Sequence, residues 1–180
     1  TGVRGIKLAD GDRVVSMSVI RHFDASPAER AAYLKMRRAM AGLTDEAEPD
    51  EEEDVDPGAV DIDYPTMSAA EDLILTITSG GMGKLSSSHD YPVRGRGGQG
   101  VMGMDKAMRG GPLVASFPVQ ADDQIMLATS KGQSIRVPVD GISFRSRAAG
   151  GVKVFNTGPE EEVVSVAWIA DQGDEDEAEE

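Results

Sequence analysis

Residues 71–79 read Glu-Asp-Leu-Ile-Leu-Thr-Ile-Thr-Ser, and residues 122–130, 51 positions later, read Asp-Asp-Gln-Ile-Met-Leu-Ala-Thr-Ser. Both stretches contain a β-rich run, residues 73–78 and 125–129. Each continues into a tight turn, Ser79-Gly80-Gly81 or Ser130-Lys131-Gly132. A β-rich run followed by a glycine-containing turn predicts the first half of a β-hairpin. The recurrence predicts two copies of one β unit.

A third, partial copy opens the chain. Gly2-Val3 parallels Gly100-Val101 and Gly151-Val152, and the run at residues 14–19 parallels residues 163–168. The first two of these Gly-Val pairs lie 98 positions apart instead of 51, so about 47 extra residues interrupt the repeat. We interpret residues 24–70 as an insertion.

Each complete copy is expected to hold about four strands, which is the content of one blade in a radial β architecture. In the first copy, the strands expected after the hairpin turn are Leu85-Ser86, a strand beginning at Gly100-Val101, and residues 113–119. In the second copy, they are residues 135–137, a strand beginning at Gly151-Val152, and residues 163–169. The fold class predicted is therefore all-β, with propeller-like blades. Two and a half blades form only a partial ring, so we expect the rest of the domain to precede Thr1.

The charge of the chain is concentrated in two segments. The formal net charge is −14, but residues 24–70 hold 13 acidic and 4 basic residues and residues 171–180 hold 7 acidic residues and no base. Of the chain's 32 acidic and 18 basic residues, this leaves 12 and 14 for the body. A slightly basic body carrying acidic segments remains compatible with nucleic-acid binding.

The insertion is expected to begin with a helix over residues 27–41. Ser26-Pro27-Ala28-Glu29 forms a capping box with proline at the first helical position, and Gly42 ends the run. We interpret this helix as a solvated spacer in preference to an amphipathic docking helix. Residues 45–63 and the tail from Gly173 have too few apolar residues to offset the entropy of ordering, and are predicted to be disordered. An acidic tail of this kind would compete with DNA for basic residues of the body.

Several kinds of site lack the residues they need. The chain has no cysteine and two histidines, so we predict no metal site, no disulfide and a reducing, cytoplasmic environment. Ser88-His89-Asp90 is three adjacent residues and is interpreted as a polar connection, because the members of a catalytic triad converge from separate segments. No apolar run approaches the roughly 18 residues of a membrane-spanning helix, so we expect no membrane partner.

Basic residues recur at turns and between strands, and two of them recur at the 51-residue offset. Equivalent positions on successive blades would form a cationic belt suited to the phosphates of a bent duplex. Gly95–Gly100 fits G-x-G-x-x-G, but a β-type run follows it instead of a helix, which favours a loop close to phosphates over a dinucleotide site. The alternative is ordinary surface charge. The candidate DNA-binding residues are Lys84, Arg94, Arg96, Gly97, Gly98, Gly100, Lys131, Arg136, Arg145 and Arg147.

Three groups of residues carry a family resemblance. Residues 2–8 with 11–16, residues 91–101 and residues 123–129 resemble the C-terminal domain of the bacterial DNA gyrase A subunit, and so do shorter matches at residues 136–139, 142–143 and 151–152. Arg96, Gly97, Gly98 and Gly100 match a degenerate copy of that family's gyrase box, with Gln99 in place of its lysine.

The resemblance implies a β-pinwheel that wraps DNA and has no catalytic residues of its own. The expected partners are double-stranded DNA and the rest of the gyrase A subunit with the B subunit in an A2B2 complex, where ATP and Mg bind outside this chain and drive negative supercoiling. The expected organisation is the end of a blade (1–23), the insertion (24–70), two blades (71–121 and 122–170) and an acidic tail (171–180). The C-terminal domain of the topoisomerase IV A subunit and a protein-interaction module are the alternatives.

Overall fold

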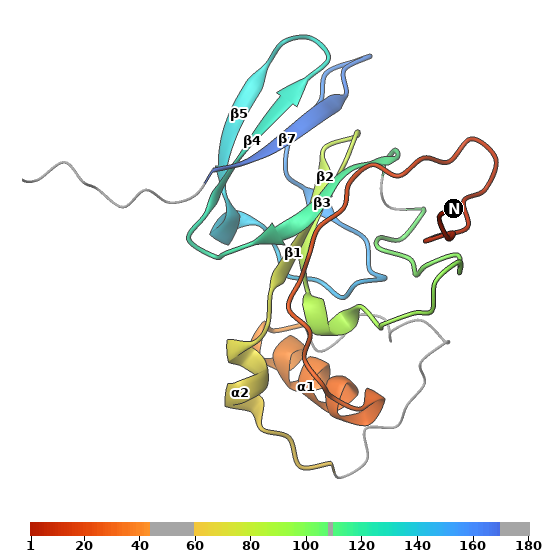
Figure 1. Ribbon diagram of the computed structural model, residues 1–180. Coiled ribbons are helices and arrows are strands. Elements are labelled where there is room, and N and C mark those ends of the chain that lie inside the picture. Colours follow the sequence, from red (N-terminus) through yellow and green to blue (C-terminus); the bar gives the residue numbers. More distant parts are fainter. Residues whose placement is uncertain (44–59, 108–109, 170–180) are drawn as a thin grey trace, which may run out of the picture.

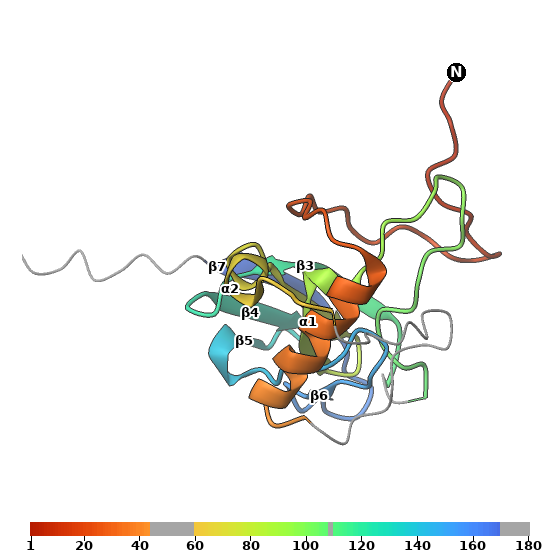
Figure 2. The same cartoon turned by 90° about the horizontal axis from the view of Figure 1, so that it is seen from below.

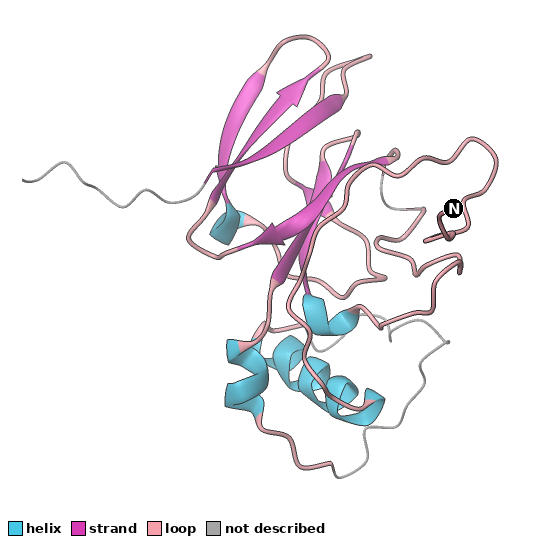
Figure 3. Ribbon diagram, viewed as in Figure 1, coloured by secondary structure: helices cyan, strands magenta, loops and turns pink. Residues whose placement is uncertain are grey.

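The computed structural model describes residues 1–43, 60–107 and 110–169. Its strands form two sheets, and two helices lie together at one end of the first sheet (Figure 1, Figure 3). The expected disorder of residues 45–63 and of the tail falls mostly on residues outside the described part. Val60 to Asp63, which are described, lie outside helices and strands.

The first sheet has the strand order β3-β1-β2-β6. Three of its strands come from one repeat: β1 (Leu73–Thr78), β2 (Met82–Ser87) and β3 (Leu113–Val119). The fourth, β6 (Val152–Lys153), belongs to the next repeat and pairs antiparallel with β2 through Gly83 and Val152. This blade therefore receives a strand from the repeat that follows it.

The second sheet repeats this plan. Its order is β5-β4-β7, from β4 (Gln124–Thr129), β5 (Ser134–Pro138) and β7 (Val163–Ile169), and each pair is antiparallel. Strand β4 is the counterpart of β1, β5 of β2 and β7 of β3. Within the described residues no strand occupies the position beside β5 that β6 occupies beside β2.

The exchanged strand explains why the strand expected at Gly100-Val101 is absent and why residues 14–19, which parallel β7, also form no strand. Residues 100–103 and 14–19 form no strand. Strand β6 pairs with β2 of the copy before it, so Val101-Met102, which is equivalent to β6, would need the β2 counterpart of the preceding copy. Residues 14–19 are equivalent to β7, which pairs with β4, so they would need the β4 counterpart of their own copy. Among the described residues neither counterpart is present as a strand, so neither segment pairs in a sheet. Residues 14–19 still lie along β3, where the Ser16 hydroxyl donates to the Ser116 carbonyl at 3.1 Å.

The two sheets share one hydrophobic core. Leu75 and Ile77 of β1 pack with Ile125 and Leu127 of β4 and with Val163 of β7, and all five are buried. In β4 buried and half-buried residues alternate, as the two-residue period of a strand requires. This shared core fixes the position of one blade against the next.

The insertion leaves and rejoins the repeat at one point. The Gln120 amide donates to the Asp123 carboxylate at 2.7 Å, where two repeats join directly. At the preceding join, the Arg21 amide donates to the Asp72 carboxylate at 3.2 Å across the whole insertion. The Arg21 guanidinium adds an ion pair to Asp72 at 3.1 Å. The blade plan is therefore kept although 50 residues separate the two partners.

Helix α1 (Pro27–Met40) has the expected capping box, in which Ser26 and Glu29 satisfy each other's backbone amides. The spacer interpretation of this helix was wrong. Tyr33 is 0% exposed, stacks on Tyr64 with ring centroids 4.9 Å apart and meets the edge of His89 at 5.0 Å. Tyr33, an aromatic residue in the middle of the helix, therefore packs the helix against the rest of the protein.

Two arginines on α1 reach both repeats. The Arg37 Nε atom lies 3.1 Å from a Glu71 carboxylate oxygen, and its guanidinium carbon lies 4.2 Å from the centre of the Phe144 ring. Arg38 donates to the Ser146 hydroxyl at 3.4 Å. The helix therefore packs across the boundary between the two blades.

Helix α2 (Tyr64–Ala69) was not expected from the sequence. Asp63 caps it by accepting a hydrogen bond from the Thr66 amide, and Met67 within the helix is buried. Hydrogen bonds from the Thr66 hydroxyl and, to a smaller extent, from the Thr66 amide lower the pKa of the Asp63 carboxyl. The sequence feature that indicates this helix is Asp63, a capping residue, two positions before Pro65.

We expect Tyr33→Ala to lower the free energy of unfolding by about 3–4 kcal/mol, because it empties a fully buried aromatic site. Lys35→Ala, at an exposed position of the same helix, should change it by less than about 0.5 kcal/mol. Chemical denaturation of a protein that contains this chain measures both. Equal effects would show that the helix is a spacer after all.

Candidate nucleic-acid interface

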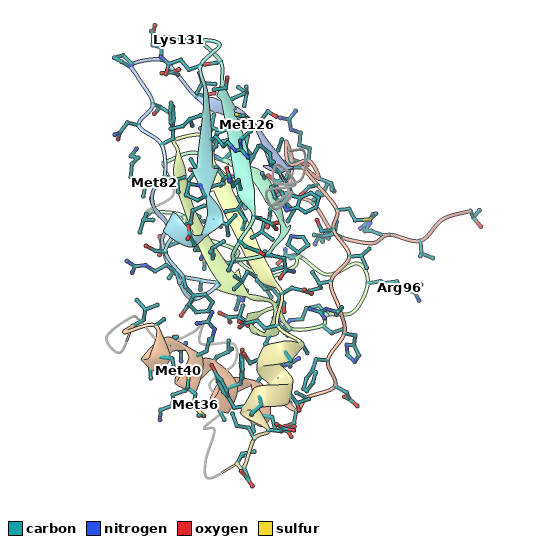
Figure 4. The ribbon with its side chains drawn as sticks, turned by 90° about the vertical axis from the view of Figure 1, so that its left-hand side faces the viewer. Met36, Met40, Met82, Arg96, Met126 and Lys131 are labelled. Atoms are coloured by element: carbon teal, nitrogen blue, oxygen red, sulfur yellow. The ribbon has the colours of Figure 1, made fainter. Side chains whose placement is uncertain are left out.

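The glycine-rich loop at residues 95–100 extends away from the sheets (Figure 2). Gly97 and Gly100 both adopt φ of +80°, a backbone conformation that other residues rarely tolerate. Arg94 and Arg96 are exposed, and Arg96 points outward from the loop (Figure 4). The loop therefore presents arginine at the surface.

A second segment, from the opening of the chain, lies against this loop. The Lys7 amide donates to the Gly98 carbonyl and the Gly97 amide donates to the Gly5 carbonyl, each at 2.8 Å. Figure 2 shows the two segments side by side. We call residues 4–7 together with residues 94–98 the first junction, because it joins successive repeats.

The first junction brings Arg4 and Lys7, which sequence reasoning did not place among the candidates, beside Arg94 and Arg96. Both added residues are exposed. The signal for them was present: Gly2-Val3 is the counterpart of Gly151-Val152, and the segment that begins with this pair crosses to a neighbouring repeat.

The assignment of Lys84 to a DNA-contacting belt was wrong. This side chain is 0% exposed, and its Nζ atom donates to the backbone carbonyls of Ser146 and Ala149, each at 2.7 Å, and to that of Arg147. Burial lowers the pKa of Lys84 to about 8, against the influence of nearby Asp90. Lys84 comes from β2 of one repeat and its acceptors from the other, so it ties two blades together.

The assignment of Arg147 was also wrong. It is 3% exposed, its backbone amide donates to the Asp90 carboxylate at 2.7 Å, and its guanidinium donates to the carbonyls of Asp90 and Met102. Burial raises the pKa of the Asp90 carboxyl, while the amide and charge of Arg147 oppose that shift. Arg145 is half-buried in the same loop, where its amide donates to the Leu85 carbonyl at 2.7 Å. This counterpart of the glycine-rich loop faces the protein interior.

Lys131 and Arg136 are exposed, but they belong to a different part of the surface. Lys131 lies at the tip of the β4–β5 hairpin, where its Nζ atom donates to the Pro159 carbonyl at 2.6 Å. Figure 4 places this tip far from Arg96. The ten candidates therefore do not form one continuous belt in this chain: Arg94, Arg96 and the three glycines share a loop, Lys131 and Arg136 share a hairpin, and Lys84, Arg145 and Arg147 lie between the blades.

Ser88-His89-Asp90 forms a short 3-10 turn (η2) and brings no nucleophile to a base. The His89 ring is buried and its Nε2 atom bonds the Met67 carbonyl at 2.8 Å. Across residues 1–43, 60–107 and 110–169, no cluster of three metal-binding side chains is present. Over the same residues, no helix is long and apolar enough to cross a membrane.

The sequence matches the profile of the family described as DNA gyrase C-terminal domain, beta-propeller, over residues 1–21, 72–116 and 123–167. These segments make up more than half of the chain and leave out the insertion. The chain belongs to the DNA gyrase C-terminal domain family. The sequence resemblance noted above, including the all-β blade architecture, is thereby confirmed.

Relatives of this gyrase domain agree with the assignment. The chain is 44% identical over 179 residues to the DNA gyrase A subunit of Granulibacter bethesdensis, an alignment that covers 92% of this chain and 19% of the relative. It is 37% identical to the corresponding protein of Rickettsia bellii, covering 98% of this chain and 19% of that one. The chain therefore spans about a fifth of the length of these relatives.

Two solved structures share the fold. A gyrase A C-terminal domain superposes with a TM-score of 0.51 at 23% identity, over 55% of this chain and 34% of the other. The C-terminal domain of DNA topoisomerase IV superposes with a TM-score of 0.50 at 22% identity, over 55% and 31%. Both likenesses establish the blade architecture of the gyrase domain.

We expect Lys84→Met to lower the free energy of unfolding by about 3 kcal/mol at pH 7, because three carbonyls, two of them in buried bonds, lose their donor. Lys131→Met is the matched control: it also removes an Nζ–carbonyl bond, but at an exposed position, and should cost less than about 1 kcal/mol.

A pH series refines this comparison. Above pH 8 the folded protein has released a proton from Lys84 that the unfolded chain still binds up to about pH 10.4. The free-energy difference between wild type and Lys84→Met should therefore increase with pH in that window. A flat difference would mean that Lys84 keeps an ordinary pKa.

Proposed function

We propose that this chain is part of the DNA-binding and DNA-wrapping domain of a DNA gyrase A subunit. The observation that carries the proposal is the exposed glycine-rich loop with Arg94 and Arg96 at its surface. Glycines allow the backbone to approach a phosphate chain closely, and planar guanidinium groups match phosphate oxygens. Membership of a DNA gyrase domain family supports double-stranded DNA as the proposed ligand.

The proposed mode of binding is electrostatic and independent of base sequence. Residues 91–105, which include the loop, form neither a helix nor a strand. Arginines held on a loop between blades contact phosphates, fix the path of a curved duplex and release counterions on binding. Such contacts bend DNA without reading it.

In the whole enzyme this domain would act beside chemistry located elsewhere. We propose that the chain has no catalytic residue and binds neither ATP nor Mg, and that it works in the cytoplasm with the rest of the A subunit and with the B subunit in an A2B2 complex. The wrapped duplex would give strand passage its handedness, so that ATP hydrolysis introduces negative supercoils.

Two alternatives differ in their observable consequences. A topoisomerase IV domain has the same blade plan, but the relatives named above are gyrase subunits and the glycine-rich loop resembles a gyrase box. A protein-interaction module would use the acidic segments, and its binding would not require DNA.

The double variant Arg94→Gln/Arg96→Gln should weaken duplex DNA binding by a similar factor for unrelated sequences. It should also reduce the slope of log K against log salt by about 2, because each phosphate contact contributes about 0.9. Fluorescence anisotropy over a series of KCl concentrations measures both quantities. As a charge-matched control for a single substitution, Lys35→Gln on α1 should leave the slope unchanged where Arg96→Gln reduces it.

Gly97→Ala tests the loop without changing its charge. A methyl group at a φ of +80° strains the backbone, so the loop should shift and DNA affinity should fall severalfold. Gly95→Ala is the matched control, since Gly95 is not among the positive-φ residues and a Cβ there meets nothing within 4 Å. If both alanine variants bind DNA like wild type, the loop is not part of the interface.

A further inference from the structure

The contact between successive repeats occurs twice in this chain. In the first junction the Lys7 amide donates to the Gly98 carbonyl at 2.8 Å. In a second junction, made of residues 102–105 and 145–149, the Asp105 amide donates to the Ala149 carbonyl at 3.3 Å. Asp105 follows Lys7 by 98 positions and Ala149 follows Gly98 by 51, the two offsets of the repeat. The same backbone bond therefore joins both pairs of repeats.

The charges at equivalent positions of the two junctions differ. Met102 occupies the position of Arg4, and Asp105 occupies the position of Lys7. The arginines on the facing loop are kept, since Arg145 and Arg147 stand where Arg94 and Arg96 do. The first junction thus has four cations at positions where the second has two cations and one carboxylate.

The second junction is also turned inward. Arg147 donates to the carbonyls of Asp90 and Met102 and is 3% exposed. Helix α1 packs on the same loop, with Arg38 bonded to Ser146 and Arg37 lying 4.2 Å from the centre of the Phe144 ring. The insertion therefore covers the loop that would otherwise be the counterpart of the DNA-contacting loop.

The first junction is open by comparison. Arg4, Lys7, Arg94 and Arg96 are all exposed. The carboxylates nearest to Lys7 in the sequence, Asp10 and Asp12, lie beyond the two backbone bonds, at the turn in which the Asp12 amide donates to the Ala9 carbonyl. Backbone bonds at 2.8 Å on both sides hold the two cationic segments in register, so the four side chains need not be gathered when a ligand binds.

We propose that the first junction is one phosphate-binding site for duplex DNA, in which Arg4 and Lys7 of one repeat act together with Arg94 and Arg96 of the next, and that the second junction is closed to DNA by Asp90 and α1. This inference rests on the proposed DNA-binding function and assigns two further residues to it. It also implies that the second junction, where the equivalent position has a structural role, makes no phosphate contact with the bound duplex.

The test compares three variants in the full-length gyrase A subunit assembled with the B subunit, without ATP: Arg4→Gln/Lys7→Gln, Arg94→Gln/Arg96→Gln and Arg145→Gln. Binding to duplex DNA is measured over a KCl series, and thermal unfolding checks that each protein remains folded. We expect the first two variants to lose affinity by a similar factor, about 3- to 10-fold near 0.1 M salt, and to reduce the salt slope by about 2 each. We expect Arg145→Gln to leave both the affinity and the slope unchanged.

The outcomes separate the inference from the function on which it rests. If Arg94→Gln/Arg96→Gln weakens binding and Arg4→Gln/Lys7→Gln does not, the shared site is refuted while DNA binding by the loop stands. If neither variant has an effect, the proposed function itself fails. A loss of affinity in a folded Arg145→Gln protein would show that the second junction also meets DNA and would overturn its closure.

Discussion

The pairing of β6 with β2 is the contact on which the rest of the structure depends. A two-residue strand contributes little stability by itself, but it carries one repeat across to the sheet of another. The segments on either side of it are then held between blades: residues 145–149 pack over β2, and Lys84 of β2 bonds three of their carbonyls. This exchange makes the first sheet incomplete without the next repeat, so the two blades are joined by contacts between repeats as well as by contacts within them.

The same constraint explains why chemically similar cations have different roles. A basic residue near an exchanged strand lies close to backbone carbonyls of the adjoining loop. Where a carboxylate such as Asp90 is also present, the cation can be buried and neutralised, as Arg147 is. Where glycines with positive φ carry the chain outward, as at Gly97, the cation stays in solvent. Position in the repeat therefore does not determine exposure; the neighbouring charges and backbone do.

The insertion takes part in this division. It begins and ends at the point where one repeat passes to the next, so it leaves the sheets undisturbed, and its helix returns to the boundary between the blades. Tyr33, stacked on Tyr64 and in edge contact with His89, anchors that helix. A segment added to a repeat protein at such a point can cover one junction without altering the other, which makes successive blades functionally unequal.

The sequence by itself determined the repeat, the bounds of strands such as Leu73–Thr78 and Val163–Ile169, the capping box of α1 and the family, because these depend on local patterns of residue type and on spacing along the chain. Only the tertiary structure decided that Lys84 and Arg147 face inward, that α1 docks and that Arg4 and Lys7 join the glycine-rich loop. Those outcomes depend on which strand of which repeat completes each sheet. Strand exchange pairs residues about 70 positions apart, as for Gly83 and Val152, and no local periodicity records such a pairing.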